Sequence, residues 1–228
     1  MAIAARRDIH KWLSLLLCSN LVYATDIGQL QLLDLGGAPI SNAVVEYDAE
    51  PLIPQLSVSS DYIMDQKDYQ FTPRLLVVPV GALVRFPNSD ESRHHVYSFS
   101  EPRPFEIQLY AGNQADPVDF TQAGLVALGC NIHDKMSAHI YVTSAPIAQV
   151  TNERGLVTMP DIKADSGSQL QIWHPLLNIP LVYSVDELDI SSDGQVTLTL
   201  PIALPIEAEQ KTGSSLRDRL KSYKRDGD

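Results

Sequence analysis

The sequence predicts an all-β protein built as a sandwich of short strands. Apolar and polar residues alternate with the two-residue period of strands along most of the chain, for example at residues 83–86. Gly, Pro, Asn and Asp residues interrupt this pattern at intervals of roughly ten residues, which is the spacing of short antiparallel strands joined by turns. In addition, 44% of the residues are apolar, which is ordinary for a chain that buries a core.

We expect strands, in chain order, at residues 30–32, 43–47, 71–79, 83–86, 95–99, 105–109, 124–128, 139–142, 148–151, 155–159, 170–174, 181–184 and 195–200. Residues 50–70 are more polar and include Pro51 and Pro54, so we expect a long connection there, with room for one irregular helical turn. The strands beyond residue 146 either extend the first sandwich or form a second small β-domain, and the sequence leaves both open. The expected organisation is a signal peptide at residues 1–24, a first β-domain at 25–144, a β-rich extension or small β-domain at 145–205, and a charged tail at 206–228.

The first residues have the parts of a secretory signal peptide. Arg6, Arg7 and Lys11 form a basic segment, an apolar segment follows at residues 12–22, and Val22 and Ala24 supply small residues at positions −3 and −1 of a cleavage site. The apolar segment is shorter than the ~20 residues that a membrane span needs, and an uncleaved N-terminal anchor helix is the alternative. We therefore expect export to the periplasm, with no stable membrane association after cleavage.

The charge balance indicates the kind of partner. The chain has 28 acidic and 17 basic side chains, a formal net charge of −11, and the leader contains mostly basic ones. This balance argues against nucleic acid as a partner, because phosphates attract Lys and Arg. It suits docking on a basic partner protein, although solubility alone explains it equally well.

The cysteine content points to a metal. The chain has two Cys residues, and Cys18 lies in the leader, so Cys130 is the only thiol of the exported protein. It has no intramolecular disulfide partner, and a free thiol is vulnerable in an oxidising compartment. Binding to a metal as a thiolate would protect it, whereas an inert buried Cys is the alternative.

Cys130 opens the stretch Cys-Asn-Ile-His-Asp-Lys-Met, which places three ligand types at regular spacing. A thiolate (Cys130), an imidazole (His133) and a thioether (Met136) follow one another at every third position. A second source of imidazole, His94-His95, lies upstream at the start of a strand-like segment. One Cys, two His and a weak axial Met form the ligand set of a blue-copper site, because soft sulfur ligands select copper. A surface turn with a buried Cys is the alternative.

The region around these ligands resembles the cupredoxins, the superfamily of type 1 copper proteins that includes plastocyanin and amicyanin. The C-x-x-H-x-x-M loop has the short spacing of amicyanin. Phe86, Asn88 and His94 match a strand that ends in an aromatic residue, an Asn two residues later and a first histidine ligand beyond it. The resemblance covers about residues 60–143. Some bacterial proteins of this kind are labelled methylamine-utilisation proteins.

The resemblance implies a Greek-key, cupredoxin-like β-sandwich with additional strands on its C-terminal side. It also implies one type 1 copper ion and the function of a periplasmic electron carrier, not an enzyme, that docks transiently on redox partner proteins. Two other functions fit the same residues: a copper chaperone or storage protein, and a noncatalytic β interaction module. Residues 33–45 and 151–175 resemble carboxypeptidase-regulatory-like β-domains, which indicates a noncatalytic β-scaffold around or beside the copper domain.

Two adjacent histidines compete for the first ligand position. Spacing from Asn88 favours His94, whereas strand alternation favours His95, which shares a face with Tyr97, and aromatic residues usually mark the core. The sequence leaves both candidates open. Asn88 is expected either to tie the loop before His94 to the Cys130 loop by hydrogen bonds, or simply to form a turn.

Overall fold

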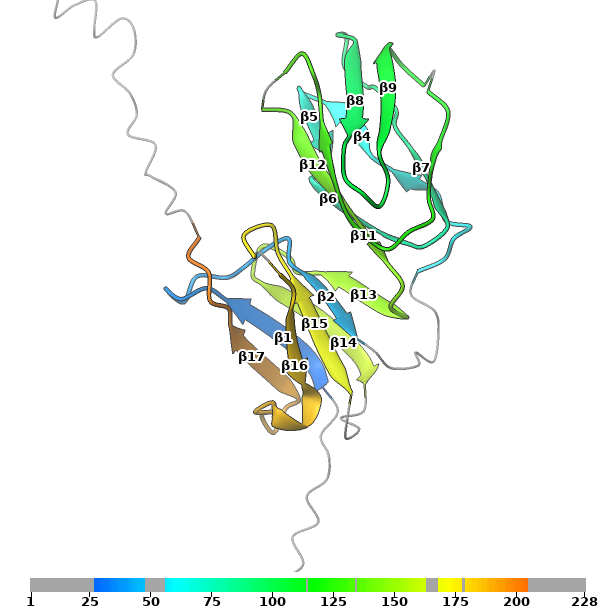
Figure 1. Cartoon of the computed structure of the whole chain (residues 1–228). Helices are drawn as coiled ribbons and strands as arrows, with labels where there is room; N and C mark the ends of the chain where they lie inside the picture. Colours follow the sequence, from blue (N-terminus) through cyan, green and yellow to red (C-terminus); the bar gives the residue numbers. More distant parts are fainter. Residues whose placement is uncertain are drawn as a thin grey trace, which may run out of the picture.

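The protein is an all-β molecule of two β-units, as the computed structural model shows (Figure 1). The structure describes residues 27–47, 56–113, 115–133, 135–162, 168–177 and 179–204. Within this part of the chain, the short 3-10 turn η1 (Val185–Glu187) is the only helical element, and no helix has the length and apolar character to cross a membrane. The predicted fold class, an all-β sandwich, is confirmed. The expected leader (1–24) and tail (206–228) lie outside the described residues.

The first unit, here named the site unit, contains residues 56–143. Its strands are β3 (Tyr62–Ile63), β4 (Asp65–Lys67), β5 (Gln70–Thr72), β6 (Leu75–Pro79), β7 (Ala82–Arg85), β8 (His94–Ser98), β9 (Phe105–Tyr110), β10 (Val118–Phe120), β11 (Gly124–Gly129) and β12 (Ser137–Thr143). A five-stranded sheet, β6-β12-β11-β8-β9, packs on a three-stranded sheet, β10-β7-β3, and β4 and β5 form a hairpin. The sheets enclose one core, because inward residues of both, such as Val84 and Val126, are fully buried in one apolar cluster.

The site unit departs from the sequence prediction in three ways. The strand expected at residues 71–79 is split at Pro73, which has no N–H to donate to a strand ladder. The polar segment expected as a connection contains β3, β4 and the start of β5, which are too short to show a period of two. Finally, β6 pairs with β12 and β3 with β7 in parallel, so the sandwich is mixed rather than purely antiparallel.

The second unit, here named the flanking unit, contains residues 27–47 and 147–204. Its strands are β1 (Ile27–Leu33), β2 (Val44–Tyr47), β13 (Ile147–Val150), β14 (Leu156–Ile162), β15 (Gln169–Trp173), β16 (Leu181–Ser184) and β17 (Gln195–Thr199). They form a four-stranded sheet, β13-β2-β15-β16, and a three-stranded sheet, β14-β1-β17. Leu30 and Leu170, from the two sheets, are both fully buried in one apolar cluster, so these sheets also share a core.

The pairing of β2 with β13 corrects the expected domain boundaries, 25–144 and 145–205. Ile147 pairs with Tyr47 and Val150 with Val44, so the chain leaves the flanking unit after β2, forms the site unit and returns beside β2. The site unit is therefore an insertion in the flanking unit. The physical reason is that β2 is buried at all four positions, so the backbone N–H and C=O groups along both of its edges need partners, and β13 and β15 supply these.

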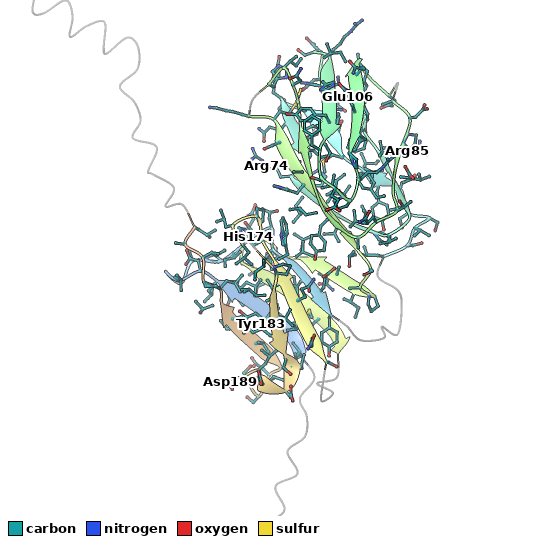
Figure 2. The ribbon with its side chains drawn as sticks, viewed as in Figure 1. Arg74, Arg85, Glu106, His174, Tyr183 and Asp189 are labelled. Carbon is teal, nitrogen blue, oxygen red and sulfur yellow. The ribbon has the colours of Figure 1, made fainter. Side chains whose placement is uncertain are left out.

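An apolar cluster and a buried carboxylate join the two units, and Figure 2 shows side chains of both units meeting there. The cluster contains Val44, Leu75, Val77, Tyr141, Ala148 and Trp173. Glu46 of β2 accepts hydrogen bonds from the Tyr141 hydroxyl at 3.0 Å, from Gln171 Nε2 at 2.6 Å and from the Thr143 hydroxyl. Burial and the Glu46 carboxylate raise the pKa of Tyr141, so this hydroxyl remains protonated and able to donate.

We expect Gly155→Ala to destabilise the flanking unit more than Gly37→Ala does. Both glycines have positive φ, 70° and 82°, so either alanine costs about 1–3 kcal/mol of backbone strain. A Cβ at Gly155 would also lie 2.4 Å from the Leu32 carbonyl oxygen, whereas a Cβ at Gly37 would have nothing within 4 Å. Denaturant titration measures both free energies of unfolding. Equal losses would contradict the close approach of the Gly155 turn to β1.

Candidate metal centre

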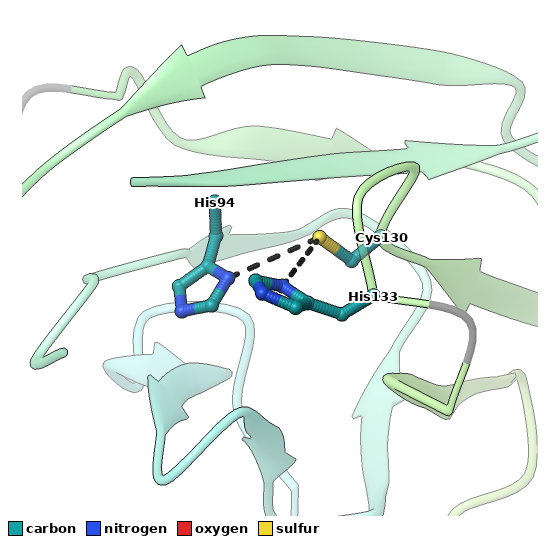
Figure 3. Close-up of side chains that lie close together, drawn as sticks. All are labelled: His94, Cys130 and His133. Carbon is teal, nitrogen blue, oxygen red and sulfur yellow. Dashed lines mark hydrogen bonds between the residues drawn. The ribbon is translucent and has the colours of Figure 1, made fainter. Parts of the chain in front are cut away.

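Three side chains of the site unit direct their donor atoms at one another (Figure 3). His94 begins β8, Cys130 directly follows β11, and His133 lies in the loop after Cys130. His94 Nδ1 lies 3.9 Å and His133 Nδ1 3.7 Å from Cys130 Sγ, and all three donor atoms lie within 4.8 Å of one another. No second group of this kind occurs among the described residues.

These spacings fit a metal ion. Bonds of about 2.0 Å to imidazole nitrogen and about 2.3 Å to thiolate sulfur would, in a trigonal plane, separate N and S by roughly 3.7 Å. The observed distances of 3.7 and 3.9 Å need only a small adjustment. Two imidazoles and one thiolate are the equatorial donors of a trigonal copper site. The cluster of His94, Cys130 and His133 is therefore compatible with a copper ion, which is the metal that the sequence predicted.

Backbone hydrogen bonds close the loop from Cys130 to Met136. The Met136 N–H donates to the His133 carbonyl at 2.9 Å, the His133 N–H to the Cys130 carbonyl at 3.4 Å, and the Cys130 N–H to the Met136 carbonyl at 3.2 Å. Two successive tight turns thus bring His133 back toward Cys130. Met136 is 2% exposed and belongs to the same apolar cluster as Cys130. It lies on the buried side of the loop, and its role as an axial ligand remains a prediction.

Asp90 holds the His94 ring from the side opposite Cys130. Its Oδ2 lies 2.7 Å from His94 Nε2, and its two oxygens also accept the backbone N–H groups of Asp68 at 2.7 Å and Tyr69 at 3.0 Å. Burial raises the pKa of Asp90, but hydrogen bonds from Tyr69, His94 and Asp68 outweigh it, so this pKa is below its usual range. With its Nε2–H donated to a carboxylate, a neutral His94 has the Nδ1 lone pair facing Cys130.

The structure places the two adjacent histidines in different surroundings. His94 is completely buried and faces Cys130. His95 Nε2 instead lies 2.8 Å from an oxygen of Glu106 on β9, and Figure 2 labels Glu106 at the end of the site unit away from the flanking unit. Of the two candidates, His94 is therefore the one positioned as a ligand, and His95 is not brought to the cluster.

The alternation argument that favoured His95 fails because the aromatic side chains of this strand do not mark the core. The inward face of β8 carries His94 and Val96, both fully buried. Tyr97 and Phe99 lie on the outer side, with ring centroids 5.2 Å apart, and Phe99 is 86% exposed. Tyr97 instead lies over Gly129, where an added Cβ would come within 2.8 Å of the Tyr97 ring.

Asn88 does not tie the His94 loop to the Cys130 loop. Its Nδ2 donates to the Ser92 carbonyl at 2.9 Å and to the Tyr110 carbonyl at 3.0 Å, and its Oδ1 accepts the Asp90 N–H at 3.0 Å. It therefore shapes the loop that presents Asp90 and fastens this loop to the end of β9. Its side-chain bonds join the ends of its own loop and the end of β9, and none of the three goes to the Cys130 loop.

Two residues at the site were not predicted, Asp90 and Tyr69. The carboxylate four positions before His94 was a local signal for Asp90. No local pattern pointed to Tyr69, because the turn between β4 and β5 carries it and only the fold brings that turn to the histidines. His139 and His174 lie outside the cluster, and burial lowers the pKa of both imidazoles.

Comparisons of the chain with known proteins give partial structural likenesses. No family model and no curated protein matches the sequence. Among solved structures, a Cu-containing nitrite reductase from Thermus scotoductus SA-01 is similar at 25% identity and a TM-score of 0.35, over 37% of this chain. The chain spans only 22% of that reductase.

Two other similar structures are small proteins matched almost over their whole length. A purple cupredoxin from Nitrosopumilus maritimus has 18% identity and a TM-score of 0.33, over 36% of this chain and 100% of its own. A reduced Trp-to-Tyr mutant of amicyanin has 19% identity and a TM-score of 0.35, over 43% of this chain and 98% of its own.

We expect Asp90→Asn to weaken Cu(I) binding by roughly 10–100-fold, because the loss of a carboxylate behind a ligand histidine has an effect of this size. Competition with a colorimetric Cu(I) chelator measures the change. Glu106→Gln is the matched control, since it alters the carboxylate that pairs with His95 in the same way. Equal effects of the two variants would contradict the assignment of His94 to the site.

Proposed function

We propose that this protein is a type 1 copper protein that carries single electrons between redox partners. One observation carries the proposal: the Nδ1 atoms of His94 and His133 converge on the sulfur of the buried Cys130. Copper bound there would supply the one-electron chemistry, by changing between Cu(I) and Cu(II).

The residues of the chain support this role by holding the donors still. Asp90 fixes the His94 ring, and backbone hydrogen bonds fix the loop that carries Cys130 and His133. A site whose ligands cannot rearrange suits electron transfer, because both oxidation states then share nearly one geometry. His133 is the partly exposed member of the set, so we propose that electrons enter and leave on its side.

We also propose a cellular location and a kind of partner for the protein. The expected leader supports a periplasmic location without stable membrane association. The acidic chain supports transient docking on basic redox partner proteins rather than on nucleic acid. We propose no catalytic activity, because a one-electron carrier transforms no substrate.

We expect the protein with Cu(II) to show an intense visible band from Cu(II)–thiolate charge transfer, and Cys130→Ser to lack it. The reason is that serine cannot supply the sulfur from which the charge moves. Visible absorption spectra of both proteins, loaded with one equivalent of Cu(II), make the comparison. A colourless wild type that binds Cu(I) tightly would contradict electron transfer and favour copper handling.

We also expect His94→Ala to abolish or strongly shift that band and His95→Ala to leave it in place. Only the first variant removes a nitrogen that faces Cys130, since His95 points to Glu106. The same spectra, with circular dichroism to confirm folding, separate the two residues. The reverse result would assign the ligand to His95.

A further inference from the structure

Tyr69 has an unusual backbone conformation at the edge of the metal site. It lies in the two-residue turn between β4 and β5, with φ of 59° beside Asp68 with φ of 54°. Gly, Asn and Asp adopt this left-handed conformation readily, whereas a large aromatic residue rarely does. A strained residue that the surroundings hold in place suggests a functional role for its side chain.

The Tyr69 ring lies against both imidazoles of the site. Its centroid is 5.0 Å from that of His133 and 5.9 Å from that of His94, edge-to-face in each case, with interplanar angles of 74° and 85°. Tyr69 is 54% exposed, so part of this residue faces solvent while its ring contacts the two imidazoles. The ring therefore lies between the histidines and bulk water.

The backbone of Tyr69 acts on the same site. Its N–H donates to Asp90 Oδ2 at 3.0 Å, and this is the oxygen that lies 2.7 Å from His94 Nε2. One residue thus orients the carboxylate behind His94 and covers the rings of His94 and His133. The left-handed turn makes both contacts possible, because it directs the N–H and the ring toward the site together.

Where the loop faces Tyr97 and Ser137, the side chains of Cys130 and Met136 are almost completely buried. An open hollow of about 280 Å³ reaches the loop there, between Tyr97 and Ser137. Cys130 and Met136 line it, but they are only 4% and 2% exposed. The partly exposed His133 leaves the Tyr69 side as the route by which a small ligand would approach the metal.

We propose that Tyr69 is a lid and positioning residue that closes the copper site to incoming ligands. With the lid in place, small anions and chelators do not reach the metal, and electrons cross through the covered histidine rim without a new bond to copper. This inference rests on the proposed function. It specifies that the electron passes to a protein partner without any atom of that partner binding to copper.

Two variants test the role of the Tyr69 ring separately from that of the turn that carries it. Tyr69→Asn removes the ring but keeps a residue that adopts positive φ readily, so the turn and its N–H to Asp90 are retained. Tyr69→Phe keeps the ring and removes only the hydroxyl, which lies 3.3 Å from Ser92 Oγ. Asp68→Asn is the control for the turn itself, because it changes the neighbouring positive-φ residue without touching the ring.

The test is azide titration of the four Cu(II)-loaded proteins, followed in the visible spectrum. We expect Tyr69→Asn to develop an azide-to-copper band, and the wild type, Tyr69→Phe and Asp68→Asn to keep their spectra. We also expect a Cu(I) chelator to remove copper from Tyr69→Asn roughly tenfold faster than from the wild type. The reason is that the free energy of an edge-to-face ring contact corresponds to a factor of about this size.

The outcomes distinguish the lid from the proposed function. A wild type with the thiolate band that binds azide as readily as Tyr69→Asn would overturn the lid and leave electron transfer standing. A Tyr69→Asn protein that resists azide would do the same. A wild type without the thiolate band would overturn the proposed function and the lid with it.

Discussion

The contact between Asp90 and His94 is the constraint on which the site depends. An imidazole offers two nitrogens, and only one of them faces Cys130. Asp90 engages the other nitrogen and is itself held by two backbone N–H groups of the turn at Asp68 and Tyr69. The Asp90 carboxylate is held by the β4–β5 turn, whereas His94 belongs to β8. Rotation of the His94 ring would therefore break its contact with a carboxylate that is fixed in place.

The insertion of the site unit between β2 and β13 separates two tasks within one chain. The flanking unit buries its own core and contains none of the donor atoms of the cluster. It supports the site unit through the junction cluster and through Glu46, whose oxygens accept hydrogen bonds from side chains of both units. Both ends of the inserted segment leave from neighbouring strands, which lets the site unit form its own core without disturbing the β2–β13 pairing.

The burial of the donors supports the proposed electron transfer over the alternative of copper delivery. His94 is fully buried, Cys130 nearly so, and Tyr69 covers the partly exposed His133. A protein that passes its metal to a partner needs ligands that the partner's ligands can replace one at a time. A covered site resists this replacement but allows an electron to cross the rim, because electron transfer requires no bond to the metal.

The sequence by itself determined the all-β class, most of the strands and the loop from Cys130 to Met136. These follow from local spacing: a period of two defines a strand, and ligands three residues apart meet in tight turns whatever surrounds them. Only the tertiary structure placed His94 rather than His95 beside Cys130, joined residues 27–47 to the C-terminal strands and brought Tyr69 to the histidines. Each of these depends on which distant strands pair and which face of a strand turns inward. The energies of such long-range pairings cannot be derived from any short segment of the sequence.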